Sequence, residues 1–283
     1  MKQHSVVLLF LFSTIFLPFI SHPAEAFHVE VSPNKIEPGE AFVIMITGAR
    51  TKQLPSASLN RKKFYFSKCG KKCFISIVTV ELETGTGVYT VKLRVGKKKK
   101  NLQVAVRDTS FPTSELTLPD DQVILSPENL RRVKKENKRV KSICKTVSKR
   151  RWEGGFILPL ENDISSAYGT RRTFNNEHIS LHRGVDIAGE EGDEVMASNN
   201  GRVVFAEELF FGGNTIILDH GQGIYTLYMH LSEFNVKPRD IVSKGEIIGF
   251  VGSTGRSTDP HLHFGVKVMN ISTNPVSLVE LDL

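Results

Sequence analysis

Apolar and polar residues alternate in short runs over most of the chain, and this alternation restricts its fold more than any other feature. In residues 89–95 and 102–106 every second side chain is hydrophobic, which is the period of a β-strand with one buried face. Glycines such as Gly39 and Gly70 separate the runs at intervals typical of a small β-sandwich. The chain is therefore predicted to be mainly β, with residues 27–107 forming a β-sandwich-like accessory domain.

The last part of the chain has a similar pattern. Asn200-Gly201 predicts a hairpin turn, and no stretch after Trp152 shows helical periodicity. Residues 152–283 are therefore predicted to form an antiparallel all-β domain. The candidate strands cover residues 185–187, 195–197, 202–206, 215–218, 224–229, 247–251 and 263–268.

Residues 108–151 are predicted to connect the two domains. The first part, residues 111–125, has the composition of a linker. Ser126 followed by Pro127 is typical of a helix start, and the helix is predicted to continue to about Lys149. The helix is rich in Lys and Arg. Its basic face is either simply solvated or a contact surface for an anionic polymer or membrane headgroups.

The two halves of the chain differ sharply in charge. The 283 residues carry a formal net charge of +7. Residues 1–151 hold 28 Lys and Arg against 12 Asp and Glu, whereas residues 152–283 hold 9 against 18. Because opposite charges attract, the basic half is expected to dock on the acidic domain. Nucleic acid is not predicted as a partner.

Residues 1–26 have the pattern of an export signal. Lys2 precedes a hydrophobic stretch over residues 6–20, and residues 24–26 have the small-x-small pattern of a signal peptidase site. The stretch is shorter than the roughly 20 residues that span a bilayer, and Pro18 interrupts it. We predict cleavage after residue 26, no transmembrane anchor, and a periplasmic or secreted protein.

Export permits disulfide bonds, and the chain has three cysteines. Cys69 and Cys73 flank a short turn between two strand-like runs, so they form either a bridge that clamps the turn or a pair of reduced thiols. Cys144 is either buried and inert or available for an intermolecular bridge. A zinc site built from these three residues is disfavoured, because no histidine or fourth cysteine accompanies them at ligand spacing.

Six of the nine histidines lie in the C-terminal domain. His182 and Asp186 are four residues apart, and His261 and His263 are two apart, so the latter two share one face of a strand. Two imidazoles, one carboxylate and a position left to water make the ligand set of a catalytic zinc site. A lone histidine in an apolar strand, such as His230, is more often structural. Spacing alone leaves both interpretations open.

Eight sequence blocks between residues 165 and 268 follow one another in an order known from a peptidase family. They are HRGVDI (182–187), GDEVMA (192–197), NGRV (200–203), DHG (219–221), YMHLS (228–232), KGEIIG (244–249), GSTG (252–255) and PHLHF (260–264). Together they resemble the lysostaphin/LytM-type zinc metallopeptidases, which cleave peptide bonds in bacterial peptidoglycan. Asp259 departs from the family pattern, in which glycine usually precedes the proline. The resemblance does not extend to residues 27–107.

The resemblance implies one zinc ion per chain, held by His182, Asp186 and His263. His261 and His230 are then the catalytic histidines that do not bind the metal. A neutral imidazole can take a proton from water and pass it to the leaving amine, and a second one can stabilise the oxyanion. We assign the first role to His261 and the second to His230.

The implied function is that of an exported zinc-dependent endopeptidase that hydrolyses peptide bonds of peptidoglycan during cell-wall remodelling. Peptidoglycan is then the expected partner, and the basic half is expected to meet the anionic wall or to restrain the enzyme by covering its groove. Two alternatives remain open. One is a catalytically silent wall-binding regulator or activator of another wall hydrolase, and the other is a secreted protease acting on host or competitor proteins.

Overall fold

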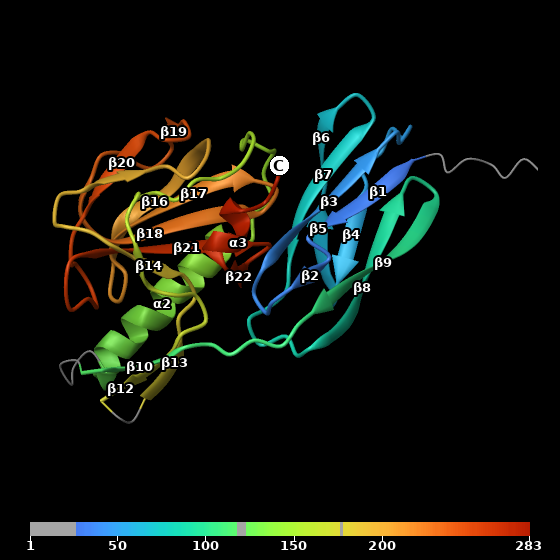
Figure 1. The fold of residues 1–283 in the computed structure, drawn as a ribbon. Coiled ribbons are helices and arrows are strands. Elements are labelled where there is room, and N and C mark those ends of the chain that lie inside the picture. The colour runs from blue at the N-terminus through green and yellow to red at the C-terminus, as the bar shows by residue number, and fades with distance from the viewer. Residues whose placement is uncertain (1–26, 118–122, 176–177) are drawn as a thin grey trace, which may run out of the picture.

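The computed structural model describes residues 27–117, 123–175 and 178–283. The predicted export signal, residues 1–26, lies outside the described residues. The chain is mainly β with largely antiparallel sheets, as the sequence predicts, and Figure 1 shows two β-rich bodies side by side with a long helix against one of them. Within the described ranges, no helix has the length and apolar character needed to cross a membrane.

The N-terminal β-domain, residues 27–107, consists of two sheets that share one hydrophobic core. Phe42 and Ile44 from the first sheet and Val91 and Leu93 from the second are buried in it. The first sheet has the order β1 (His28–Ser32), β3 (Ala41–Thr47), β7 (Cys73–Thr79) and β6 (Ser67–Gly70). The second has the order β2 (Lys35–Ile36), β9 (Lys98–Val106), β8 (Gly87–Val95), β4 (Ser56–Leu59) and β5 (Lys62–Tyr65).

Strands β3 and β7 are buried on both faces, because one face meets the second sheet and the other meets the C-terminal domain. Thr79 Oγ1 donates a hydrogen bond to the Glu40 carbonyl. Thr273 Oγ1 of the C-terminal domain lies 3.3 Å from Thr79 Oγ1. Gln222 Nε2 donates to the Tyr65 carbonyl across the same boundary. The N-terminal β-domain is therefore packed directly against the C-terminal domain.

The long helix α2 (Pro127–Ile143) begins as predicted, with Ser126 Oγ accepting a hydrogen bond from the Asn129 amide at 3.1 Å. The prediction that it continues to about Lys149 is wrong. The helix ends at residue 143 because the chain beyond it follows the end of a strand of the C-terminal sheet, where the Gln222 amide donates to the Ser148 carbonyl. The predicted linker also contains a strand, β10 (Thr113–Leu116), which pairs in parallel with β12 (Arg171–Phe174).

The C-terminal domain is built on one large sheet with a smaller sheet beside it. The large sheet has the order β11 (Ile164–Ser166), β14 (Val185–Ala188), β21 (His261–Val268), β18 (Ile224–Phe234), β17 (Gly213–Gly221), β16 (Gly201–Leu209) and β19 (Ile241–Val242), with β15 (Glu194–Met196), β20 (Ile247–Val251) and β22 (Ile271–Thr273) attached. The smaller sheet contains β10, β12 (Arg171–Phe174) and β13 (His178–Leu181).

Two local predictions for this domain are wrong. Asn200-Gly201 forms no hairpin, because β15 pairs with β20 whereas β16 pairs with β17 and β19. Asn200 Oδ1 instead accepts a hydrogen bond from the Lys244 amide. A short helix, α3 (Pro275–Val279), follows the last strand, with Asn274 as its N-cap. A helix of this length is too short to produce a readable periodicity.

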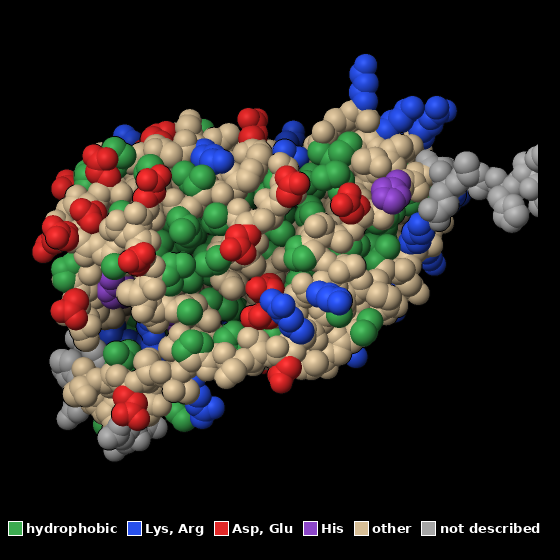
Figure 2. Space-filling view, viewed as in Figure 1, with side chains coloured by type: hydrophobic (Ala, Val, Ile, Leu, Met, Phe, Trp, Pro, Cys, Tyr) green, Lys and Arg blue, Asp and Glu red, His purple; other side chains and the backbone are tan. Residues whose placement is uncertain are grey.

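The charge contrast is visible on the surface. Figure 2 shows acidic side chains gathered over the C-terminal domain and basic side chains at the far end of the N-terminal β-domain. From α2, Arg139 pairs with Glu207 of β16 at 2.5 Å. In the ion pair between the two domains, however, the acidic residue belongs to the basic half of the chain: Glu83 pairs with Arg183 of the C-terminal domain. The contact between the domains therefore does not follow the overall charge contrast.

The structure decides between the alternatives for the cysteines. Cys69 and Cys73 form a disulfide across the turn between β6 and β7. Cys144 is fully buried in a small cluster with Phe205 and Tyr225, under the end of α2. Burial raises the pKa of its thiol to about 11. Cys144 is therefore an inert core residue, and an intermolecular bridge is excluded in this fold.

His220 has a structural role in the C-terminal domain. Its Nδ1 atom donates to the Asn200 carbonyl at 2.8 Å, and its Nε2 atom lies 2.7 Å from Thr226 Oγ1. Burial lowers the pKa of the ring to about 4. The folded state therefore holds His220 neutral at a pH where the unfolded chain, with an ordinary pKa of about 6.5, already binds a proton.

We predict that His220 makes the protein less stable in acid. Between pH 6.5 and pH 4 it should lower the free energy of unfolding by about 1.4 kcal/mol per pH unit, and it should contribute no pH dependence above that range. The check is urea denaturation of the wild type and His220→Gln across this range, with chelator present in both. The slope against pH should be smaller for the variant by about that amount. Equal slopes would contradict the assignment.

Candidate metal centre

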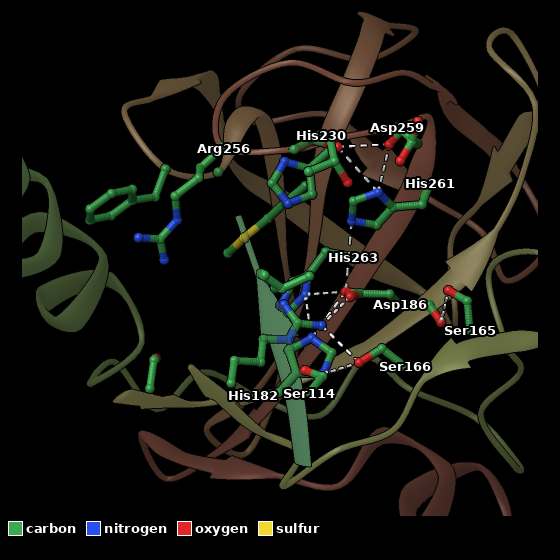
Figure 3. Close-up of a pocket in the computed structure, with 18 of the residues that line it drawn as sticks. Ser114, Ser165, Ser166, His182, Asp186, His230, Arg256, Asp259, His261 and His263 are labelled. Atoms are coloured by element: carbon green, nitrogen blue, oxygen red, sulfur yellow. Dashed lines mark hydrogen bonds and ion pairs between the residues drawn. The ribbon is translucent and has the colours of Figure 1, made fainter. Parts of the chain in front are cut away.

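Three neighbouring strands of the large sheet bring the predicted site residues together. Strand β14 pairs with β21 so that Asp186 lies opposite His263, and β21 pairs with β18 so that His263 also lies opposite Met229. His261 is two residues before His263 and shares its face of the sheet. Figure 3 shows these side chains pointing into one cavity. His182 reaches the same point from the loop that joins β13 to β14.

Three side-chain atoms converge closely enough to hold a single metal ion. His182 Nε2 lies 3.0 Å from both Asp186 Oδ1 and His263 Nδ1, and the last two atoms are 2.8 Å apart. The ligand atoms around a tetrahedral zinc ion lie about 3.3 Å from one another, because each is about 2.0–2.1 Å from the metal. We call His182, Asp186 and His263 the ligand triangle. Its spacing fits a metal such as zinc with only a slight expansion.

The ring of His182 is oriented by the backbone. Its Nδ1 atom lies 2.9 Å from the Ala167 carbonyl, an acceptor, so the proton of the neutral ring sits on Nδ1. The lone pair is then on Nε2 and points into the ligand triangle. A hydrogen bond of this kind, from the remote ring nitrogen to a carbonyl, is the usual support of a metal-binding histidine.

Arg172 is a residue that the sequence analysis missed. From β12 its guanidinium donates to Asp186 Oδ2 and, at 2.8 Å, to Ser166 Oγ. One carboxylate oxygen is thereby occupied, and Oδ1 is left for the ligand triangle. The only sequence signal is an arginine pair, Arg171-Arg172, in an otherwise acidic domain, and it does not reveal which carboxylate Arg172 reaches.

The surroundings favour the protonation states that a metal requires. Burial opposes the charge of Asp186, but its close contacts with the His182 and His263 rings outweigh burial, so the pKa of the carboxyl group is lowered. Burial also lowers the pKa of the His263 ring. The carboxylate is therefore charged and the imidazole neutral at neutral pH, as metal ligands must be.

The segment that carries two of the ligands lies directly on β21. Gly184 stands between His182 and Asp186 in the chain, and a Cβ atom at this position would come within 2.6 Å of the Phe264 carbonyl oxygen and 2.7 Å of His263 Nε2. A side chain at this position would therefore push the ligand-bearing loop away from the strand that carries the third ligand. The glycine is required by close packing.

His230 and His261 form a second pair of imidazoles beside the ligand triangle, with ring centroids 4.8 Å apart. His261 Nδ1 lies 2.8 Å from the Asp259 carbonyl, and His230 Nδ1 lies 2.8 Å from the Thr254 carbonyl. In its neutral form, each ring therefore carries its proton on Nδ1 and has an unprotonated Nε2. His261 Nε2 is 3.8 Å from Asp186 Oδ1, just outside the ligand triangle.

A bulge in β18 brings His230 to the cavity. Simple alternation would place Met229 and His230 on opposite faces, yet both line the cavity. The pairing with β17 shifts register between Tyr228 and Leu231, and His230 has a φ of +66°. Such bulges re-aim a side chain and are frequent next to active sites. Burial lowers the pKa of His230 to about 3, so its ring is neutral at physiological pH.

The cavity around these residues has a volume of about 640 Å³. Its walls include Ser114 and Leu116 of β10, from the segment predicted as a linker, and Arg256, whose guanidinium stacks on Phe211 at 4.0 Å. Among the described residues that line it, none comes from the N-terminal β-domain. Helix α2 supports the opposite wall, since Glu136 accepts a hydrogen bond from the backbone just before Phe211.

Sequence comparison agrees with this geometry. Residues 180–275, which include the ligand triangle and both further histidines, match the profile of Peptidase family M23. The chain carries an M23 peptidase domain. This agrees with the family resemblance recognised from the sequence blocks.

Named relatives share this domain but are longer proteins. The DD-carboxypeptidase/endopeptidase Mpg of Neisseria meningitidis is 43% identical over 128 residues, which is 44% of this chain and 30% of the relative. Lysostaphin of Staphylococcus simulans is 45% identical over 96 residues, covering 33% of this chain and 20% of the relative. The chain thus spans less than a third of the length of these relatives.

A crystal structure of a putative M23 peptidase from Pseudomonas aeruginosa resembles the fold over both domains. Its TM-score is 0.67 at 23% sequence identity, with 86% of this chain and 94% of that chain covered. The similarity therefore includes the N-terminal β-domain and the segment after it. At this level of identity the comparison concerns the fold alone.

We predict that His263 and His261, although they share one face of β21, differ in their effect on metal binding. His263→Ala removes one corner of the ligand triangle and should weaken divalent-metal affinity by at least about 100-fold, judging from the effect of even indirect supports of a ligand. His261→Ala removes no member of the ligand triangle and no support of one, so the affinity should stay within about threefold of the wild type. Metal titration followed by elemental analysis measures both. Metal loss in His261→Ala would contradict the ligand set.

Proposed function

We propose that the protein is an exported, zinc-dependent endopeptidase that hydrolyses peptide bonds of bacterial peptidoglycan. The observation that carries the proposal is the intact ligand triangle with two further imidazoles beside it in one open cavity. The M23 domain supports hydrolysis of peptide bonds, and a relative named Peptidoglycan DD-endopeptidase ShyA, from Vibrio cholerae and 38% identical over 112 residues, supports peptidoglycan as the substrate. Residues 1–26 support export.

The donor atoms of the ligand triangle suit zinc. Two imidazole nitrogens and one carboxylate oxygen, with no fourth side-chain ligand among the residues that the structure describes, form the usual set of a catalytic zinc site. A bound zinc ion supplies Lewis-acid polarisation of a peptide carbonyl and lowers the pKa of bound water to about 7. Arg172 occupies Asp186 Oδ2, so Oδ1 is the oxygen that would bind the ion, and the Ala167 carbonyl orients the ring of His182.

His261 is the better placed proton carrier of the two further histidines. It has an unprotonated Nε2 atom near the ligand triangle, and its side chain keeps a relative exposure of 18%, so it can exchange protons with solvent. We propose that this atom takes a proton from the attacking water and delivers it to the leaving amine.

The hydrogen bond and the burial of His230 restrict its possible role more than those of His261 do. An oxyanion requires an N–H donor, and the neutral ring of His230 has its only N–H on the side of the Thr254 carbonyl. The role of oxyanion stabiliser that we assigned to it therefore needs the protonated ring, which burial disfavours. In its neutral form, His230 can accept a hydrogen bond from the attacking water and orient it.

The intact site also bears on the alternatives. A silent wall-binding regulator has no need of five converging titratable side chains in an open cavity. A secreted protease with protein substrates would use the same chemistry, so an assay on both substrate classes separates it from the proposal.

We predict that the full chain, loaded with zinc, releases new muropeptides with free amino termini from purified peptidoglycan. A chelator should abolish the release, and added zinc should restore it. Mass spectrometry of the products identifies the cleaved bond, and a casein digest run in parallel tests for general proteolysis. Absence of new termini, or cleavage that persists in chelator, would overturn the proposed function.

We also predict that His261→Ala lowers kcat on a soluble muropeptide substrate by roughly 10²–10⁴-fold, the usual contribution of a general base. Its metal content should remain that of the wild type, which separates a lost proton carrier from a lost ligand. His28→Ala, at an exposed position of β1, is the matched control and should keep full activity. Activity of His261→Ala within threefold of the control would exclude the role.

A further inference from the structure

A second cavity, of about 820 Å³, opens beside the metal centre where the three parts of the chain meet. It shares Arg183, Phe211, Gly212, Met229 and His263 with the first cavity, so the two cavities adjoin along these residues. Its remaining walls come from the N-terminal β-domain, from helix α2 and from the strands β18, β21 and β22. We call these two adjoining cavities the groove, and His263 lines both of them.

Strand β21 forms the floor of this groove. His263, Gly265 and Lys267 alternate along it and share one face. Gly265 has no side chain, so the floor is open between the metal centre and Lys267. At about 3.3 Å per residue, the backbones of His263 and Lys267 are about 13 Å apart. An extended peptide advances by about 3.3–3.6 Å per residue, so this distance corresponds to about four residues.

Lys267 is a part-buried cation without an anionic partner. Its Nζ atom donates a hydrogen bond to Ser272 Oγ at 3.0 Å. No carboxylate of the described residues forms an ion pair with it. Of the side chains that act on it electrostatically, Cys144 favours its charged form, whereas Arg183 and Lys141, which are themselves cations, disfavour it. Burial lowers the pKa of its ammonium group. An unpaired charge in such a place is unfavourable unless a ligand supplies the countercharge.

The acidic residues at the second cavity do not supply it. Glu83 pairs with Arg183. Glu136 pairs with Arg132 at 2.7 Å and accepts the Phe210 amide with its other oxygen. The third acid, Glu81, is exposed on the N-terminal β-domain. The inner end of the cavity therefore remains positive.

We propose that the second cavity is a subsite for a carboxylate of the peptide substrate, bound by Lys267 about four residues from the cleaved bond. The subsite rests on the proposed function, because stem peptides of peptidoglycan carry several carboxylates along a short chain. Lys141 of α2 adds positive charge from the facing wall. The helix and the N-terminal β-domain thus contribute to substrate selection.

The test measures binding separately from catalysis. The probe is a cross-linked dimer of stem peptides with free carboxylates, compared with the same dimer after conversion of every carboxylate into a carboxamide. Calorimetric titration uses the full chain carrying His261→Ala, so that the probe is not consumed. We expect the acid form to bind about tenfold more tightly than the amide form, which is the scale of one charge-assisted hydrogen bond.

Adding Lys267→Met should remove this preference by weakening the acid form about tenfold, with no change for the amide form. Lys267→Arg should retain the preference, and the exposed Lys237→Met is the matched control. Equal weakening of both forms, no change in either, or no binding of either form would overturn the subsite. Preference for the acid form without cleavage of peptidoglycan by the wild type would leave the subsite standing and remove the proposed function.

Discussion

The antiparallel pairing of β14 with β21 is the constraint on which the site depends. It places Asp186 opposite His263, and every other functional group is arranged around this pair. Arg172 occupies the outer carboxylate oxygen, so that Oδ1 alone faces the two ligand imidazoles. A slip of one residue in this register would turn one ligand to the opposite face, because side chains alternate across a sheet. The chemistry of the site is therefore a property of strand pairing.

The parts of the chain before the C-terminal domain form the walls of the groove. Strand β10 lines the first cavity, and helix α2 supports the loop that carries Phe211. Of these two cavities, the N-terminal β-domain borders only the second, and it leaves the first cavity, with the ligand triangle, uncovered. The basic surface of this domain is not the surface that borders the cavity. Its basic side chains gather at its far end, whereas its contact with the ligand-bearing loop is made by Glu83.

The sequence predicts those features that depend on local patterns. Alternation identifies the β-domains, and His-x-His spacing places His261 and His263 on one face. It does not predict the orientation of His230, because the bulge depends on the pairing of β18 with β17. It also does not predict Arg172, whose role depends on a small sheet that includes β10 from a distant segment. Asn200-Gly201 misleads because the adjacent strands find partners elsewhere.

Gly184 has a consequence for how such a site can be changed. Asp186 and His263 are 77 residues apart in the chain, yet the loop before Asp186 touches the ring of His263 so closely that no side chain fits between them. The two segments form one interlocking unit. Neither can be transplanted alone into a related scaffold with the geometry preserved, so in chimeras the HRGVD loop and the HLH strand have to be exchanged together.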